Sequence, residues 1–366
     1  MELKQRIKSF AELGKSLNSF LKLVNQEELE NYQGNFCNEF KELNSAINSS
    51  FHYNGWFTRE NVLFSINSIS ASLNETILLK WISSYETVNY PWDKSPKKIG
   101  VVMAGNIPMV GFHDMLCVII SGNVFYGKLS SQDKLLLPAL SNILLKINPD
   151  INKYIEFTSN PFKNLDAVIA TGSDNSSRYF DYYFGKYPHI IRKNRNSIAV
   201  ISGNETQEEM EDLGNDIFQY YGLGCRSVSK IMVPVGYDFD HFFKGVFKYK
   251  DLAHNNKYGN NYDYNKTVYL LGKVSLLENG FLIIKEDEGL SSPQACVFYE
   301  FYNDTNSLNE VILAQSDKIQ CIVSNQETPQ KLIDNHLKYI KFGKAQQPDL
   351  WDYADGVDTI DFLMKL

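Results

Sequence analysis

The chain has 366 residues, 43% of them hydrophobic and 13% aromatic, which is enough apolar material for a large core divided between two lobes. No apolar run approaches the ~20 residues that cross a bilayer, and no apolar segment of a secretion signal follows the charged amino terminus, so we expect a cytoplasmic protein without membrane insertion. The net charge of -7, with no basic stripe interleaved with aromatics, argues against a nucleic-acid partner.

The first ~90 residues are predicted to form a helical lead-in. Apolar residues recur there at helical spacing over 10–24, 36–47 and 62–73. After Pro91 and Pro96 the pattern changes, and short apolar strands alternate with helices. The strands expected are KIGVVMAG, NVFYGK, YIEFTS and DAVIATGS, and the helices expected span 110–121, 133–146 and 175–185. Alternation of this kind predicts a parallel sheet whose two faces are covered.

A second round of the same kind follows. Its expected elements are strand SIAVIS, helix 207–221, strand KIMVPV, helix 238–249, strands FLIIKE, QACVFYEFY and IQCIVS, and helix 329–339. The polar stretch 249–267, rich in Asn and Tyr, is typical of a surface loop. We therefore predict an α/β fold with a first domain over 1–200, a second over 201–345 and a carboxyl tail over 346–366.

Three loops of the first domain follow strands and are candidate ligand sites. They are Gly105-Asn106-Ile107-Pro108, Lys128-Leu129-Ser130-Ser131 and Thr171-Gly172-Ser173. Ligands of open α/β sheets bind outside the carboxyl ends of the strands, where these loops would converge. Each loop is also typical of an ordinary turn or helix start, and neither GxGxxG nor GxxxxGK[ST] is present.

Cys225, in the stretch YYGLGCRSVSK, is a candidate nucleophile. A thiolate is a strong nucleophile and a good leaving group, and Gly222 and Gly224 allow the backbone to approach a covalent intermediate closely. The alternative is a small buried apolar residue, which is a common role for cysteine. The five cysteines are odd in number and scattered, without a CxxC pair, so we expect thiols in a reducing compartment and no metal site.

Taken in order, the motifs GN-P, K-x-S, TGS and GxxC resemble the aldehyde dehydrogenase superfamily. Within it, the chain is most similar to the LuxC-type acyl-CoA reductases, the fatty-acyl reductase component of bacterial luminescence and its relatives. The resemblance covers roughly residues 95–350, and the tail FGKAQQPDLWDYADGVDTIDFL also looks like the carboxyl end of that branch. It implies an aldehyde-dehydrogenase-like fold, with a cofactor-binding lobe and a lobe that carries the catalytic cysteine.

The resemblance also implies roles for the catalytic residues. Cys225 matches the family nucleophile, and Asn106 matches the donor that faces the negative oxygen of the tetrahedral intermediate. One such donor is typically worth ~3 kcal/mol. His113, on the expected helix 110–121, is predicted to be a helix residue and not a base.

The cofactor residues follow in the same way. Lys128 and Ser130 match the K-x-S motif whose lysine holds the adenosine ribose, and Thr171, Gly172 and Ser173 match the phosphate contact at a helix start. Ser131 falls where NAD-preferring members carry a glutamate, which would repel a 2′-phosphate. The resemblance therefore implies NADPH as the cofactor.

The sequence departs from the superfamily where hydrolytic members carry the glutamate that activates water. The corresponding stretch here is IIRKNRNSIAVISG, residues 190–203, and the first carboxylate after it is Glu205. Without a base, water would attack the acyl-enzyme slowly. A second superfamily glutamate has only Glu288, at a shifted position, as its counterpart. The charge run Arg192, Lys193 and Arg195 is either a phosphate contact or a solvated face.

We therefore expect an enzyme that reduces an acyl-CoA thioester to an aldehyde with NADPH, through an acyl-enzyme on Cys225. The alternatives are a hydrolytic NAD(P)-dependent aldehyde dehydrogenase and a non-catalytic scaffold of the same fold. The tail after Pro348 is a candidate arm, packing either on its own cofactor lobe or on a second subunit of a homo-oligomer.

Overall fold

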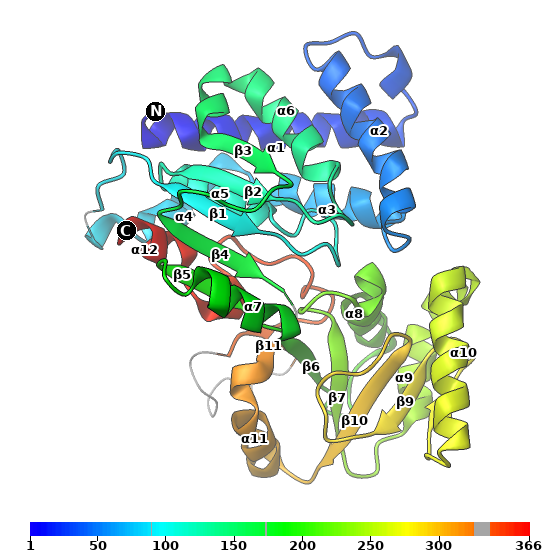
Figure 1. The fold of residues 1–366 in the computed structure, drawn as a ribbon. Helices are drawn as coiled ribbons and strands as arrows, with labels where there is room; N and C mark the ends of the chain where they lie inside the picture. Colours follow the sequence, from blue (N-terminus) through cyan, green and yellow to red (C-terminus); the bar gives the residue numbers. More distant parts are fainter. Residues whose placement is uncertain (89, 173, 326–336) are drawn as a thin grey trace. The chain divides into compact units, whose positions relative to one another are not determined.

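The computed structural model describes residues 1–88, 90–172, 174–325 and 337–366. The chain forms two compact units (Figure 1). Unit 1 comprises Met1–Lys193 together with Asp349–Leu366, and unit 2 comprises Asn194–Pro348.

Unit 1 begins with a helical layer, which confirms the expected lead-in. Its helices are α1 (Leu3–Asn25), α2 (Cys37–Tyr53), α3 (Arg59–Ser72) and α4 (Glu75–Ser83). The hydroxyl of Thr58 accepts from the backbone of Asn61 to cap α3, and Asn74 caps α4 in the same way. The apolar stripes predicted at helical spacing are buried, as Phe10 and Val62 show at 0% exposure.

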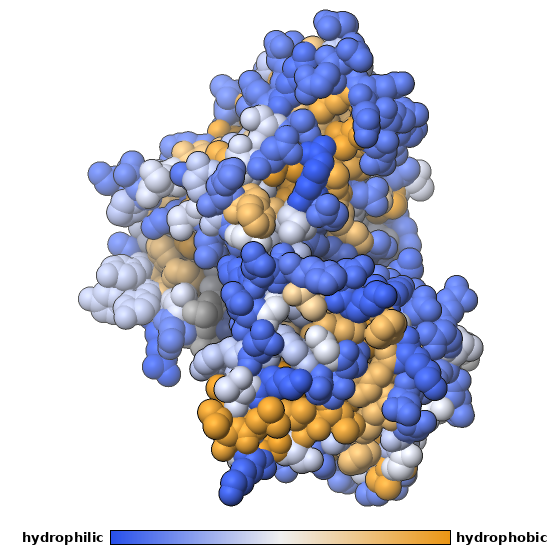
Figure 2. Space-filling view, turned by 90° about the vertical axis from the view of Figure 1, so that its right-hand side faces the viewer, coloured by the Kyte–Doolittle hydropathy of each residue, from blue (hydrophilic) through white to orange (hydrophobic). Residues whose placement is uncertain are grey.

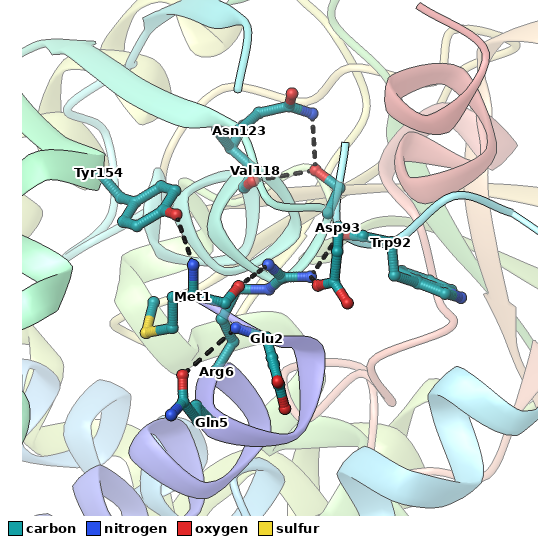
Figure 3. Close-up of polar contacts among 10 residues, drawn as sticks. Met1, Glu2, Gln5, Arg6, Trp92, Asp93, Val118, Asn123 and Tyr154 are labelled. Atoms are coloured by element: carbon teal, nitrogen blue, oxygen red, sulfur yellow. Dashed lines mark hydrogen bonds and ion pairs between the residues drawn. The ribbon is translucent and has the colours of Figure 1, made fainter. Parts of the chain in front are cut away.

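The start of α1 is fixed by Arg6, which is almost completely buried (Figure 3). Its guanidinium donates to the carbonyl oxygens of Met1 and, at 2.7 Å, Trp92, and it pairs with Asp93 at 3.7 Å. The amino group of Met1 donates to the hydroxyl of Tyr154 at 3.1 Å. A buried charge needs such partners to be tolerated, so these contacts fix where α1 packs within unit 1.

The sheet of unit 1 has five parallel strands in the order β3-β2-β1-β4-β5. The strands are β1 (Lys98–Val102), β2 (Val124–Lys128), β3 (Ile155–Thr158), β4 (Ala167–Thr171) and β5 (His189–Arg192), and the helices are α5 (Phe112–Ile120), α6 (Leu136–Ile147) and α7 (Asp174–Phe184). The strand order reverses between β1 and β4. That point is a topological switch point, where ligands of such sheets bind.

The carboxyl tail belongs to unit 1 and ends in α12 (Thr359–Met364). The hydroxyl of Tyr353 accepts from the indole nitrogen of Trp81 at 2.7 Å and shares a 2.5 Å hydrogen bond with Tyr85. Tyr85 donates to Asp358 at 2.7 Å. These buried polar contacts tie the tail to the end of α4.

Unit 2 contains a seven-stranded sheet in the order β12-β11-β6-β7-β10-β9-β8, in which only β8 runs antiparallel to its neighbour. The strands are β6 (Asn196–Val200), β7 (Val228–Pro234), β8 (Leu277–Glu278), β9 (Ile283–Glu286), β10 (Cys296–Tyr302), β11 (Ile319–Val323) and β12 (Tyr339–Ile340), and the helices are α8 (Gln207–Phe218), α9 (Phe239–Val246), α10 (Asn256–Leu271) and α11 (Thr305–Ala314). Both units are thus α/β with parallel sheets, as expected.

Three details differ from the sequence expectations or lie beyond them. The expected boundary near residue 200 falls inside the strand SIAVIS, whereas the structure divides the units between Lys193 and Asn194, because β6 pairs with β7 and β11 of unit 2. The stretch 249–267 is not a loop, since α10 covers most of it. The expected helix 329–339 lies mostly outside the described residues: only its last three residues, 337–339, are described, and Tyr339 begins β12.

In the part of the chain that the structure describes, no single helix is long and apolar enough to cross a membrane, although the bent pair α3 and α4 together passes by length and composition. The face seen in Figure 2 is mostly hydrophilic, with hydrophobic areas gathered into patches. The large apolar side chains exposed in unit 2 include Val235, Leu270 and Leu271.

Candidate active site

The three candidate loops of unit 1 follow neighbouring strands at the switch point. Val102, the last residue of β1, lies opposite Lys128 of β2 and Ala170 of β4. The first two loops are in direct contact, because a Cβ added at Gly105 would lie 2.4 Å from the hydroxyl oxygen of Ser130. Only glycine allows this approach, so the sheet brings the Asn106 loop and the Lys128 loop together.

Buried polar side chains hold the Asn106 loop from three directions. Asn54 donates to the carbonyl oxygen of Gly105 at 2.8 Å, and Ser65 donates to that of Pro108 at 3.1 Å. The backbone N–H of Met109, which has a left-handed φ of 54°, donates to Asp133 at 2.6 Å. These contacts satisfy backbone groups that no strand or helix pairs, and they leave the side chain of Asn106 exposed.

The charged form of Asp133 is disfavoured by burial. Burial raises its pKa from 3.8 to about 6, although the N–H groups that it faces, Met109 first, act in the opposite direction. It links the loop that follows β1 to the start of α6. No sequence pattern points to Asp133, since an isolated aspartate after Ser-Ser-Gln is typical of a turn.

The residues expected to hold a cofactor offer a suitable set of groups. Lys128, Ser130 and Thr171 are half-buried, and Ser131 is exposed. A Cβ at Gly172 would lie 2.8 Å from the ring of Phe180, so the backbone of the loop after β4 packs closely against α7. The positive charge, hydroxyls and tight glycine turn fit the ribose and phosphates of a dinucleotide. Ser173 lies outside the described residues.

Cys225 lies in unit 2, on the loop that joins α8 to β7, and its side chain is exposed. The alternative of a small buried residue is therefore wrong. Cys117, Cys296 and Cys321 do have that role. Burial is the main cause that raises the pKa of Cys296 to about 12 and that of Cys321 to about 11, which keeps those thiols protonated and inert.

The backbone before Cys225 is strained. Tyr220, Tyr221 and Gly222 have consecutive positive φ angles of 55°, 57° and 73°, and for the two tyrosines this left-handed conformation is costly. Asn255 donates to the hydroxyl of Tyr221 at 3.0 Å. Both tyrosines are buried, so packing and this bond keep the turn in a shape that exposes the following thiol.

Hydrogen bonds also fix the backbone around the thiol. The hydroxyl of Ser197, on β6, donates to the carbonyl oxygen of Cys225 at 3.0 Å. The backbone N–H of Gly224 donates to the hydroxyl of Ser227 at 3.2 Å. Sequence reasoning missed both serines, because each acts through the fold.

A small cavity lies behind this loop, lined by residues that include Phe218, Tyr221, Val228 and Tyr258. The hydroxyl of Tyr258 lies buried without a hydrogen-bond partner among the described residues. The cavity offers about 20 Å³. That is room for one water molecule and not for an acyl chain.

Arg192 is not available to bind a phosphate. Its guanidinium donates to both carboxylate oxygens of Asp114, at 2.7 and 2.8 Å, and to the hydroxyl of Thr359 at 3.1 Å. Burial pushes the pKa of Arg192 down, but the charge and hydrogen bonds of Asp114 act against it and the net change is upward. Arg195 donates to the carbonyl oxygen of Ile319 at 3.3 Å, and Lys193 is exposed.

The carboxylate of Glu205 is hydrogen-bonded within a turn. It is buried and accepts from the backbone N–H groups of Ser202 and Gly203, at 2.6 and 2.9 Å, and from the hydroxyl of Ser202. These three donors engage both carboxylate oxygens, so the side chain of Glu205 holds the turn that precedes α8. Glu288 is exposed, and its carbonyl oxygen accepts from Lys230 at 2.9 Å. His113 contacts the carbonyl oxygen of Leu350 at 2.9 Å, consistent with a helix residue.

Residues 11–238, more than half of the chain, match the family model described as acyl-CoA reductase (LuxC). The chain belongs to the LuxC acyl-CoA reductase family. It is therefore an oxidoreductase, and the resemblance read from the motifs is confirmed. No curated protein matches the chain.

Solved structures with a similar fold are aldehyde dehydrogenases and related oxidoreductases. The NAD⁺ complex of an aldehyde dehydrogenase from Bacillus cereus has a TM-score of 0.62 at 13% identity, covering 93% of this chain and 76% of that one. An oxidoreductase from Marinobacter aquaeolei has a TM-score of 0.63 at 12% identity, with 95% and 79% covered. Aldehyde dehydrogenase 21 from Physcomitrella patens, in complex with succinate, has a TM-score of 0.60 at 12% identity, with 98% and 87% covered. At these identities the likeness shows the fold.

Proposed function

We propose that the protein reduces an acyl-CoA thioester to an aldehyde with NADPH, using Cys225 as the nucleophile. The observation that carries the proposal is the exposed thiol of Cys225 on a strained, hydrogen-bonded turn in a member of an acyl-CoA reductase family. Backbone strain of this kind persists where the surrounding structure over-determines it, which is common at functional sites.

The reaction begins when the thiolate of Cys225 attacks the thioester carbonyl. The family resemblance assigns the donors to the oxygen that becomes negative, which would be the side-chain amide of Asn106 and the backbone N–H of Cys225, and such donors are typically worth ~3 kcal/mol each. Coenzyme A leaves with the electron pair of the broken carbon–sulfur bond, and the acyl group remains on Cys225. NADPH, when bound, supplies the hydride that reduces this acyl group. The resulting thiohemiacetal releases the aldehyde and returns the thiolate to Cys225.

The cofactor is assigned to the strand ends of unit 1. Lys128, Ser130 and Ser131 would hold the adenosine ribose and its 2′-phosphate, and Thr171, Gly172 and Ser173 would meet the diphosphate at the start of α7. An uncharged Ser131 beside a lysine favours a phosphorylated ribose, because a carboxylate there would repel it.

The three bonds to Glu205 support thioester transfer over hydrolysis. They engage the first carboxylate after the stretch that would otherwise carry the water-activating base. Without such a base the acyl-enzyme resists water, which leaves a thiol as its exchange partner.

The test follows NADPH absorbance with acyl-CoAs of increasing chain length. We expect the wild type to oxidise NADPH and form one aldehyde and one coenzyme A per turnover. Cys225→Ala should be inactive, and Cys37→Ala, which changes a half-buried thiol on α2, should keep wild-type activity. Carboxylic acid formed from an aldehyde without coenzyme A would instead show a hydrolytic dehydrogenase. No turnover with any acyl-CoA would favour a non-catalytic scaffold.

A further inference from the structure

A short segment of unit 2, Phe342–Gln346, lies against the Cys225 loop although more than a hundred residues separate them in the sequence. The carbonyl oxygen of Ala345 accepts from the guanidinium of Arg226 at 3.5 Å. The side-chain amide of Gln346 donates to the hydroxyl of Ser227 at 3.2 Å. The segment therefore contacts both residues that follow the thiol.

The second of these contacts leads directly to the nucleophile. The hydroxyl of Ser227 that Gln346 bonds also accepts from the backbone N–H of Gly224, and the N–H of Ser227 donates to the carbonyl oxygen of Gly224 at 2.9 Å. Cys225 lies inside the small ring closed by these two bonds. Moving Ser227 would therefore move the backbone on both sides of the thiol.

The segment is itself anchored by Asp216 of α8, which is completely buried. Its two carboxylate oxygens accept from the backbone N–H groups of Gly343 and Ala345, at 2.7 and 2.9 Å. Gly343 has a left-handed φ of 77°, a conformation for which glycine is suited. A buried carboxylate with two backbone donors and no cationic partner at contact distance in the described residues fixes a chain geometry at a cost in stability.

The charges around the loop are arranged by the same contacts. The guanidinium of Arg226 acts to lower the pKa of Cys321, whereas the proximity of Cys225 and Asp216 acts to raise it, all against the larger effect of burial. Arg226, Cys225 and Asp216 therefore lie close enough to Cys321 to share one electrostatic environment. Arg226, which follows the nucleophile in the chain, contacts the segment through its bond to Ala345.

We infer that the Phe342–Gln346 segment is a positioning element for the nucleophile, in which Asp216 fixes the backbone of the segment and Gln346, through Ser227, fixes the turn that presents Cys225. The inference rests on the proposed role of Cys225, and none of these three residues is assigned contact with the substrate. A shift of the sulfur by about 1 Å is enough to lower the rate, because the reaction requires the thiolate and the carbonyl carbon to lie in a near-attack geometry.

The test uses two neighbouring glutamines. Gln346→Ala removes the donor to Ser227, and Gln347→Ala is the matched control, since Gln347 is exposed. Two quantities are measured for each full-length variant: kcat and KM with an acyl-CoA, and the rate at which iodoacetamide alkylates Cys225. Mass spectrometry of the peptide that contains Cys225 separates its alkylation from that of the other thiols.

We expect Gln346→Ala to lower both kcat and the alkylation rate on the order of 10-fold, with KM changed much less. Gln347→Ala should match the wild type in all three. Asp216→Asn, which keeps the size of the side chain but can accept from only one of the two N–H groups, should act in the same direction and keeps the test decisive where Gln346→Ala fails to fold.

Equal alkylation rates and kcat in the wild type, Gln346→Ala and Asp216→Asn would overturn the inference. The alkylation rate does not depend on acyl-CoA chemistry. A wild type without reductase activity whose Cys225 is alkylated more slowly in Gln346→Ala would refute the proposed function and leave the positioning role standing.

Discussion

The buried ion pair between Arg192 and Asp114 offers the sharpest stability prediction. The two side chains are 7% and 6% exposed, and the carboxylate receives two hydrogen bonds from the guanidinium. Asp114→Asn keeps the shape but removes the negative charge, which leaves a buried guanidinium uncompensated. Breaking one partner of such a pair typically costs about 3–5 kcal/mol.

The double variant Asp114→Leu with Arg192→Met should recover most of this loss. Both charges are then absent, so no desolvated ion remains, and apolar replacements of buried pairs are often neutral or stabilising by roughly 1–4 kcal/mol. The exposed pair Lys15–Glu12, at 3.2 Å with side chains 69% and 47% exposed, is the control. Lys15→Ala should change stability by less than about 1 kcal/mol, because water screens exposed pairs.

Urea unfolding followed by tryptophan fluorescence is the appropriate assay. All four tryptophans, Trp56, Trp81, Trp92 and Trp351, belong to unit 1, so the signal reports the unit that contains the ion pair. The reasoning is refuted if Asp114→Asn unfolds at the same urea concentration as Lys15→Ala. It is equally refuted if the double variant is less stable than Asp114→Asn.

Two further predictions concern unit 1. The folded state holds a proton on Asp133 more tightly than the unfolded chain, with a pKa of about 6 against 3.8, so this stability is present below pH 4 and is lost as the pH rises through 6. The loss is about 3 kcal/mol, and Asp133→Asn should flatten the corresponding slope in urea unfolding; an unchanged slope would exclude Asp133 as its source. Ser131→Glu should lower kcat/KM for NADPH relative to NADH on the order of 10-fold or more, since the carboxylate repels a 2′-phosphate, and a constant ratio would contradict the assigned ribose contact.

The elements that the sequence predicts well are those whose own residues carry a strong pattern, such as a continuous apolar run. Strands β1 and β4 of unit 1 are nearly continuous apolar runs, and the loops that follow them carry glycine. Helix α10 was missed because its sequence has no apolar face and is rich in Asn and Tyr, which favour helices weakly. It packs through only three buried residues, Tyr258, Tyr262 and Asn265, a pattern that periodicity does not detect.

The charge run at the end of β5 shows a different limit. Arg192 is the last residue of β5 and is buried, whereas Lys193, the next residue, lies beyond the strand and is exposed. The burial of Arg192 depends on Asp114, which lies 78 residues earlier. No local pattern distinguishes such a residue from a solvated or phosphate-binding arginine.

Local sequence patterns also do not reveal the buried partners of the two loops that carry the proposed chemistry. A buried carboxylate accepts backbone N–H groups in each unit, Asp133 for the Asn106 loop and Asp216 for the segment beside Cys225. Burial, the largest cause, raises the pKa of Asp216 to about 7 from 3.8. Its stability contribution is therefore present below pH 4 and lost as the pH rises through 7, the reverse of a salt-bridged aspartate.

Each loop thus keeps its geometry at neutral pH against a cost in folding stability. A carboxylate that served only stability would be better replaced by a neutral residue, because ionisation in a buried site is unfavourable. Asp216 adds two acceptor oxygens at fixed positions, which a neutral side chain of that size does not offer to two N–H groups at once. Asp133 acts through Oδ2, the oxygen that accepts from Met109. The two carboxylates thus fix the backbone of the loop that carries Asn106 and of the segment beside Cys225, at a cost in folding stability.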